Sequence, residues 1–248
     1  MDILISFDDT KKFCMLISSV IKPLRNKIPN ANIEVVSGCD FCRKLLSHIP
    51  GITNVTDQVS LGEYDSVYCF DDRISNLVKY KSIQCKEYIG YKIENNIIGF
   101  CGDMLDEFFE CYCLKYSCSS NVLNSFFNVF GIKWNREGFD VCYKPKSRSN
   151  DSRDGVAISN GNLRSFVKNN LFNNGEKLWH VPIRQDPLKC IDEVNKCSNI
   201  VTDNIFYAFI GSFLRKKIIF LVEDGYSFSP NIFDDTVIQK VSTQVLYD

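Results

Sequence analysis

CIDEVNKCSNIVTDNIFYAFIGSFLRKKIIFLV, residues Cys190 to Val222, is the stretch that decides the fold. Its pattern predicts a short helix, a buried strand at Asn199 to Thr202, a polar turn, a second helix and a second apolar strand at Ile218 to Val222. In open sheets of parallel strands, ligands bind where the carboxyl ends of strands meet the amino ends of helices. The turn after the first strand is therefore a candidate site for an anion or a sugar. Its residues are Thr202, Asp203 and Asn204.

The same turn has a simpler explanation. An Asp or Asn immediately before an apolar helical run is also the ordinary N-cap of a helix, because its side-chain oxygen accepts a backbone N–H of the first turn. The sequence leaves both roles, capping and ligand contact, open for this turn.

The charge distribution argues against nucleic acid as a partner. The net charge is −1 at pH 7, and the Lys and Arg residues are scattered along the chain. The densest basic cluster, Arg215 to Lys217, comes at the expected end of a helix, where cations interact favourably with the helix dipole. Proteins that bind DNA or RNA carry a basic patch or stripe instead.

The N-terminal sequence MDILISFDD has no basic segment and only a short apolar run. No window reaches the roughly 18 apolar residues that are needed to span a bilayer. We therefore expect a cytoplasmic protein with no transmembrane segment, and we leave peripheral contact with a membrane open.

The chain contains twelve cysteines, and several lie inside apolar runs, where Cys behaves as a small hydrophobic residue. Without a signal peptide, a reducing compartment is expected. Cys39 and Cys42 form half of a zinc-like motif, but Cys111, Cys113 and Cys118 lack the spacing of a second half, and the two histidines lack ligand spacing. We expect neither a metal ion nor a cofactor.

Strands and helices alternate along the first part of the chain. This order predicts a mostly parallel sheet with right-handed crossovers and helices on both faces. Residues 103 to 130 form a largely helical, aromatic-rich segment that we interpret as core packing rather than a cofactor site. The expected strands are Ile3 to Phe7, Asn32 to Ser37, Ile52 to Val55, Tyr64 to Phe70 and Tyr88 to Tyr91, and the expected helices are Phe13 to Lys27 and Phe41 to His48.

A second α/β series follows the most polar window of the chain, KPKSRSNDSRD. The predicted organisation is an N-terminal Rossmann-like domain at 1–146, a linker at 147–154 and a reduced C-terminal Rossmann-like domain at 155–248. The second domain begins with a strand at Gly155 to Ser159 and a turn at Asn160 to Asn162. It continues with a helix from Leu163, a strand at Trp179 to Ile183 and a terminal helix at Ile232 to Leu246.

Five segments resemble motifs of glycosyltransferase family 9, the bacterial heptosyltransferases of GT-B architecture. The matches are co-linear and cover most of the chain, and the resemblance implies a GT-B-like fold of two Rossmann-like domains. The segments are IPNANIEVVSGCDFCRKLLSHIPGITNV (28–55), YDSVYCFDD (64–72), EYIGYK (87–92), FFNVFGIKW (126–134) and SNIVTDNIFYAFIGSFLRKKIIFLV (198–222).

The sequence departs from the family pattern at two motifs. The family opens its first helix with Gly-Asp, whose Asp is taken as the general base, whereas the corresponding helix here opens with DDTKKFC. The family motif D-[ST]-G-x-x-H becomes Asp203 to Tyr207, which lacks the Gly and the His. Losing that Gly removes a close backbone approach to phosphate. The end region also resembles polysaccharide pyruvyltransferases, whose motif His is absent here too.

The resemblance implies an inverting, metal-independent transfer of a sugar from a nucleotide-sugar donor to a glycan or other hydroxyl acceptor. It implies Asp9 or Asp8 as the catalytic base, because the acceptor hydroxyl must lose a proton. On the donor side, Arg164 or Lys168 would lie near the diphosphate and backbone amides around Asn160, Gly161 and Asn204 would contact its oxygens. Thr202 lies in the same turn, and Asp203 would bind sugar or ribose hydroxyls.

Each of these roles has a structural alternative. Asp8 and Asp9 could cap the first helix, Arg164 and Lys168 could form a solvated helix face, and Tyr207 could belong to the core. The competing functions are a non-catalytic GT-B-like binding protein and a pyruvyltransferase-like group transferase. The missing Gly and His favour the binding protein, whereas the carboxylates at two strand ends favour the enzyme.

Overall fold

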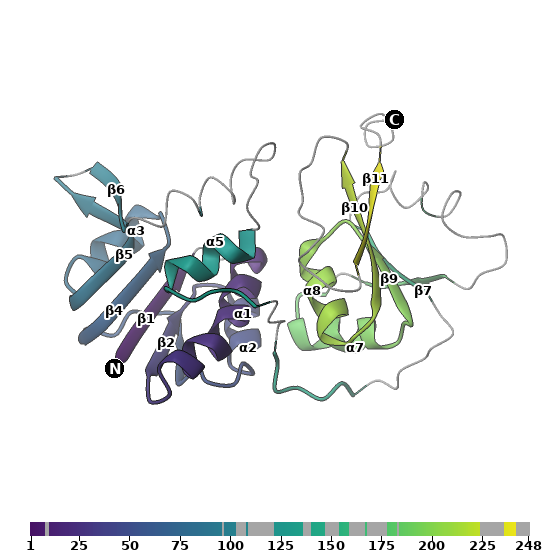
Figure 1. The fold of residues 1–248 in the computed structure, drawn as a ribbon, viewed down its shortest axis with the longest axis horizontal. Coiled ribbons are helices and arrows are strands. Elements are labelled where there is room, and N and C mark those ends of the chain that lie inside the picture. The colour runs from purple at the N-terminus through teal and green to yellow at the C-terminus, as the bar shows by residue number, and fades with distance from the viewer. Residues whose placement is uncertain are drawn as a thin grey trace. The chain divides into compact units, whose positions relative to one another are not determined.

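The computed structural model describes two compact units, the first ending at Cys142 and the second beginning at Tyr143 (Figure 1). Each unit has its own sheet. Of the expected linker at 147–154, the structure describes only the last residue, Asp154. The described residues are 1–7, 10–95, 97–102, 108, 122–135, 140–146, 154–158, 167, 178–182, 184–223 and 236–241.

The first unit is built on a sheet whose described strands follow the order β3-β2-β1-β4-β5-β6. The neighbouring pairs from β3 to β5 are parallel, and only the pair β5–β6 is antiparallel. The predicted mostly parallel sheet is thus confirmed. The strands are β1 Asp2–Phe7, β2 Asn32–Val36, β3 Asn54–Thr56, β4 Glu63–Phe70, β5 Gln84–Glu94 and β6 Ile97–Cys101.

Helices cover both faces of this sheet, because alternate residues of a strand point to opposite faces. Phe7 of β1 contacts Phe13 of α1 with ring centroids 6.3 Å apart. Leu4, three residues before Phe7 and so on the opposite face of β1, belongs to a buried cluster with Leu77 and Tyr80 of α3. The described helices of this unit are α1 Lys11–Lys27, α2 Asp40–Leu46, α3 Ile74–Tyr80 and α5 Val122–Val129.

An aromatic cluster forms the core between β1, β4, α1 and α5. Phe108 and Phe126 are fully buried, with ring centroids 5.1 Å apart, and Phe13 and Phe70 lie 5.4 Å apart beside them. The described part of the aromatic-rich segment 103–130 therefore packs into the core, as predicted. Aromatic pairs of this kind add about 0.5–1.5 kcal/mol each beyond the area they bury.

The second unit contains a sheet with the described order β11-β10-β9-β7-β8, and all its neighbouring pairs are parallel. Asp186 caps α7 by accepting the N–H groups of Leu188 and Lys189, and Pro187 occupies the first turn, where its missing N–H costs nothing. The elements are β7 Asp154–Ala157, β8 Leu178–His180, α7 Pro187–Asn195, β9 Asn199–Thr202, α8 Ile205–Phe213, β10 Lys217–Glu223 and β11 Thr236–Val241.

The predicted terminal helix is wrong over its described part. Residues Thr236–Val241 form β11, which pairs in parallel with β10 from Ile218↔Thr236 to Glu223↔Val241. The segment TVIQKV is rich in β-branched residues, which favour a pleated strand, and the ladder with β10 satisfies its backbone groups. Tertiary pairing therefore overrides the helical spacing of its apolar residues.

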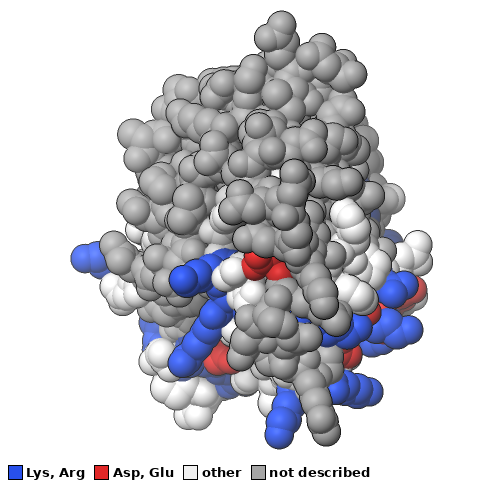
Figure 2. Space-filling model, turned by 90° about the vertical axis from the view of Figure 1, so that its right-hand side faces the viewer, with Lys and Arg blue, Asp and Glu red and all other residues white. Residues whose placement is uncertain are grey.

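The described charged side chains are mixed on the surface. Figure 2 shows Lys and Arg side chains spread around the described part of one face, with Asp and Glu side chains between them. Among the described residues, no helix combines the length and the apolar character needed to cross a bilayer.

Candidate functional site

The carboxyl end of β9 is joined to that of β7 through the side chain of Thr202. Thr202 is fully buried, and its hydroxyl donates to the carbonyl of Ala157 at 2.6 Å and accepts the N–H of Asn204 at 3.0 Å. Ala157 and Thr202 are also register partners in the sheet. The Thr202 hydroxyl therefore holds two strand ends together and shapes the turn that follows.

Asn204 is the N-cap of α8. Its backbone is extended, and its Oδ1 accepts the N–H of Phe206 at 2.9 Å. The capping interpretation is thus confirmed for Asn204. Between these two structural residues, Asp203 is partly exposed and follows the central strand β9 of the described sheet, at the edge where open sheets of parallel strands generally bind ligands.

Tyr207 lies where the resembling family has a histidine, and it belongs to the core. Its ring is buried, and its hydroxyl donates to the carbonyl of Pro182 at 3.3 Å and lies 3.6 Å from Cys190 Sγ. Burial is the main cause that raises the pKa of Tyr207, so its phenol stays protonated. The core interpretation of this residue is confirmed.

The other predicted donor contacts, Asn160, Gly161, Arg164 and Lys168, lie outside the described residues, as do Asp8 and Asp9. The donor-side residues follow β7, whose last residue Ala157 is the carbonyl partner of Thr202. All four remain predictions.

The start of α1 corrects one alternative for Asp8 and Asp9. The N-cap is Thr10, whose hydroxyl accepts the N–H of Phe13 at 3.3 Å. The interpretation of Asp8 or Asp9 as the helix cap is therefore wrong, because the N-cap is Thr10 and the helix begins at Lys11. In sequence the two aspartates connect β1, an inner strand of the sheet, to this cap.

The neighbouring strand β4 ends in a carboxylate that is fully engaged. Asp71 is 1% exposed and accepts hydrogen bonds from the Arg73 backbone N–H at 3.0 Å, from Arg73 Nε at 2.8 Å and from Asn76 Nδ2 at 2.6 Å. A buried carboxylate held by a guanidinium is costly to break apart. Asp71 therefore fixes the turn that leads into α3.

A buried polar network next to this turn was not predicted. The hydroxyl of Ser6 in β1 contacts that of Tyr80 in α3, and Cys69 Sγ of β4 lies 3.7 Å from the carbonyl of Asp71. Burial is the main cause that raises the pKa of Cys69 to about 11. The network depends on α3, a helix that the sequence pattern did not indicate.

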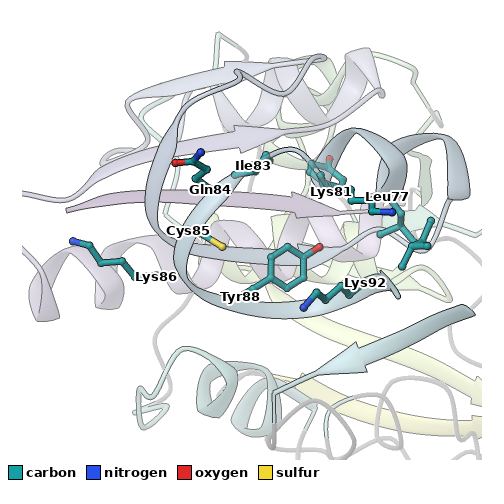
Figure 3. Close-up of a pocket in the computed structure, with 10 residues that line it drawn as sticks. Leu77, Lys81, Ile83, Gln84, Cys85, Lys86, Tyr88 and Lys92 are labelled. Carbon is teal, nitrogen blue, oxygen red and sulfur yellow. The ribbon is translucent and has the colours of Figure 1, made fainter. Parts of the chain in front are cut away.

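A cavity of about 440 Å³ opens between α3 and β5 in the first unit (Figure 3). Tyr88 and Cys85 line it together with Lys81, Lys86 and Lys92. Two of these lysines form ion pairs, Lys86 with Asp65 at 2.5 Å and Lys92 with Glu94 at 2.6 Å. The cavity begins at the amino end of β5, away from the carboxyl ends that carry the predicted site.

The described residues hold no group of three or more His, Cys, Asp and Glu side chains arranged to bind a metal ion. Within the second unit, the described candidate residue is the partly exposed Asp203. Within the first unit, the candidates Asp8 and Asp9 are placed by sequence alone, between β1 and Thr10.

No protein-family model matches the sequence, and no curated protein matches it. Solved structures do match along almost the whole chain. Heptosyltransferase WaaC of E. coli with ADP has a TM-score of 0.64 at 8% identity, covering 97% of this chain and 93% of its own. E. coli ADP-heptose lps heptosyltransferase II has 0.62 at 11%, covering 100% and 94%, and a glycosyl transferase family 9 structure from Veillonella parvula has 0.60 at 9%, covering 97% and 86%.

The chain has the fold of the family 9 glycosyltransferases. The predicted resemblance and the α/β, GT-B-like fold class are thereby confirmed. At these identities the likeness concerns the fold, and chemistry must be argued from the site.

Proposed function

We propose that the protein transfers a sugar from a nucleotide-sugar donor to a glycan or other hydroxyl acceptor, with inversion and without a metal ion. The observation that carries this proposal is the match to heptosyltransferases along almost the whole chain, both units included. Two of the matching structures are described as heptosyltransferase WaaC with ADP and with ADP-2-deoxy-2-fluoro heptose. An ADP-linked sugar is therefore the first donor to test.

In this proposal Asp9 or Asp8 is the base that removes the proton of the acceptor hydroxyl. A single displacement needs one such base, and a carboxylate at the end of an inner strand suits the role. The N-cap of α1 is Thr10 rather than either aspartate. Asp71, on the adjacent strand β4, is excluded because its oxygens are already bound by Arg73 and Asn76.

On the donor side we assign Arg164 and Lys168 to the diphosphate, whose developing negative charge they would stabilise in place of a metal ion. Backbone amides near Asn160, Gly161 and Asn204 would add hydrogen bonds. Asp203 would accept hydrogen bonds from sugar or ribose hydroxyls. It does not suit a phosphate group, because the two negative charges repel. Thr202 contributes by holding β7 and β9 together at this edge.

A second candidate is a protein that kept this fold and binds a partner or ligand without catalysis. The buried Tyr207 favours it, because the family position that holds a histidine serves the core here. The two candidates differ in whether a bound nucleotide sugar is turned over.

The test begins with thermal unfolding in the presence of UDP-, GDP-, ADP-, CMP- and dTDP-linked sugars. A donor at a hundred times its Kd stabilises the folded state by about 2.7 kcal/mol, which raises Tm by on the order of 5–10 °C. A shift with one nucleotide identifies the donor class for a transfer assay. No shift with any donor, in a folded sample, would favour the non-catalytic protein.

The base is tested by Asp8→Asn and Asp9→Asn, made singly. One of them should lower the transfer rate by a factor on the order of 10² with unchanged folding. Asp57→Asn is the matched control, because Asp57 is an exposed carboxylate just after the edge strand β3. Wild-type rates in both aspartate variants would refute the assignment of the base.

A further inference from the structure

Two cysteines lie three residues apart in the first turn of α2. Cys39 is the N-cap and Cys42 is the third helical residue, and the N–H of Arg43 closes the turn by donating to the carbonyl of Cys39 at 2.9 Å. Residues three apart in such a turn have Cα atoms about 5 Å apart. Disulfides span Cα separations of about 4.4–6.8 Å, so this spacing allows the two sulfur atoms to bond.

Cys42 also influences the ionisation of Cys39. Burial is the main cause that raises the pKa of the Cys39 thiol, and the adjacent Cys42 thiol raises it further through a side-chain hydrogen bond. Both cysteines are in the thiol form.

The pair is asymmetric in exposure. Cys39 is partly exposed, whereas Cys42 is fully buried. The Cys42 thiol points inward, where its Sγ lies 3.9 Å from the carbonyl of Thr10, the cap of α1. Cys14 Sγ lies 3.8 Å from the Cys42 carbonyl on the same side. A reagent from solvent therefore meets Cys39 first.

Among the described residues, no third metal ligand lies beside the pair. A Cys-x-x-Cys pair at the start of a helix that follows a parallel strand is typical of thiol–disulfide exchange. The strand here is β2, and α2 packs against α1 (Figure 1).

We propose that Cys39 and Cys42 form a reversible dithiol site that exchanges with low-molecular-weight disulfides. The Cys39 thiolate attacks one sulfur of the small disulfide, which releases one small thiolate and forms a mixed disulfide. Cys42 then loses its proton and attacks Cys39 Sγ, which releases the second small thiol. In total, two electrons and two protons pass from the two cysteines to the small disulfide. The Cys42 S–H group, which lies against the Thr10 carbonyl, is lost in the process.

The experiment equilibrates the purified protein with reduced and oxidised glutathione over a wide range of ratios, followed by acid quenching, alkylation and peptide mass spectrometry. We expect a Cys39–Cys42 disulfide, seen as a loss of two hydrogens from one peptide, which increases with the oxidised fraction and disappears when the ratio is reversed. Two thiols at every ratio would overturn the proposal, and this result needs no variant.

Variants test the order of attack. Cys42→Ser should trap a glutathione adduct on Cys39, and Cys39→Ser should leave Cys42 unmodified in the folded protein. Cys142→Ser is the control, because Cys142 is an exposed free thiol outside α2, and its loss should leave the exchange unchanged. An adduct on Cys42 in Cys39→Ser, with native circular dichroism, would refute Cys39 as the attacking thiol.

Discussion

Replacement of Gly90 by alanine should destabilise the first unit strongly. Gly90 has φ of +136°, which side chains rarely adopt, and it is the residue at which β5 changes partner from β4 to β6. A Cβ atom there would lie 2.0 Å from the carbonyl oxygen of Cys69. That neighbour is backbone in the adjacent strand, so the contact is relieved only if β4 and β5 move apart.

The size of the effect follows from two contributions. A left-handed backbone costs a residue with Cβ about 1–2 kcal/mol. Moving the strands apart weakens one or two hydrogen bonds of the ladder, at about 1 kcal/mol each. The free energy of unfolding should fall by about 3 kcal/mol, which lowers Tm by on the order of 10 °C for a unit of this size.

The assay is urea unfolding, followed by circular dichroism, with Gly99→Ala as the matched control. Gly99 lies in the adjacent strand β6, and a Cβ atom there meets nothing within 4 Å. We expect Gly99→Ala to stay within about 0.5 kcal/mol of the wild type. Equal unfolding midpoints for Gly90→Ala and Gly99→Ala would refute the steric argument.

Two further predictions concern the cap of α8 and the ionisation of a buried phenol. Asn204→Ala should lower the free energy of unfolding by about 1 kcal/mol, because the N–H of Phe206 loses its acceptor. Asn204→Ser should retain most of the wild-type stability, because Ser is also a good N-cap. Equal denaturation midpoints for the two variants would contradict the cap. Burial raises the pKa of Tyr68 from 10.0 to about 12, so the folded state holds this proton more tightly than the unfolded chain. The stability that the protonated Tyr68 contributes is fully present below pH 10. It is lost as the pH rises from 10 to 12, by up to about 2.7 kcal/mol. The stability of Tyr68→Phe should fall by correspondingly less over this range. Parallel stability curves for the two proteins over this range would refute it.

The elements that the sequence predicted are those whose apolar residues follow one period along a buried stretch. The strands at Ile3 to Phe7 and Asn199 to Thr202 are examples, since nearly all their residues are buried. The helix α3 was missed because it is short and exposes Ile74 and Val78 while burying Leu77. Its apolar residues therefore do not form the single stripe that indicates an amphipathic helix.

The site was predictable where its contacts are local in sequence. The cap at Asn204 involves a residue two positions away and follows from residue type. The Thr202 hydroxyl instead binds Ala157, 45 positions away, and only the pairing of β7 with β9 brings the two together. The same holds for Ser6 and Tyr80, which are 74 positions apart. Local pattern carries no information on such contacts.

The residues that carry the family resemblance divide into those that serve the fold and those that serve chemistry. Gly90 is required by its backbone conformation. Gly131 has φ of +60° and ends α5, where the N–H of Ile132 donates to the carbonyl of Phe127 at 3.1 Å. These glycines account for two of the matching motifs without any reference to a substrate.

The position at which the family has a histidine is filled by Tyr207, whose hydroxyl is bound inside the core. The two persisting glycines are therefore explained by folding, whereas the motif at Asp203 to Tyr207 has changed at the turn where a ligand contact was predicted. A catalytic role cannot be argued from the persisting glycines, because the fold alone requires them. The proposed catalytic role depends on the carboxylates of Asp8, Asp9 and Asp203. Single aspartate-to-asparagine variants at these positions therefore discriminate between an enzyme and a binding protein better than substitutions of the glycines in the resembling segments.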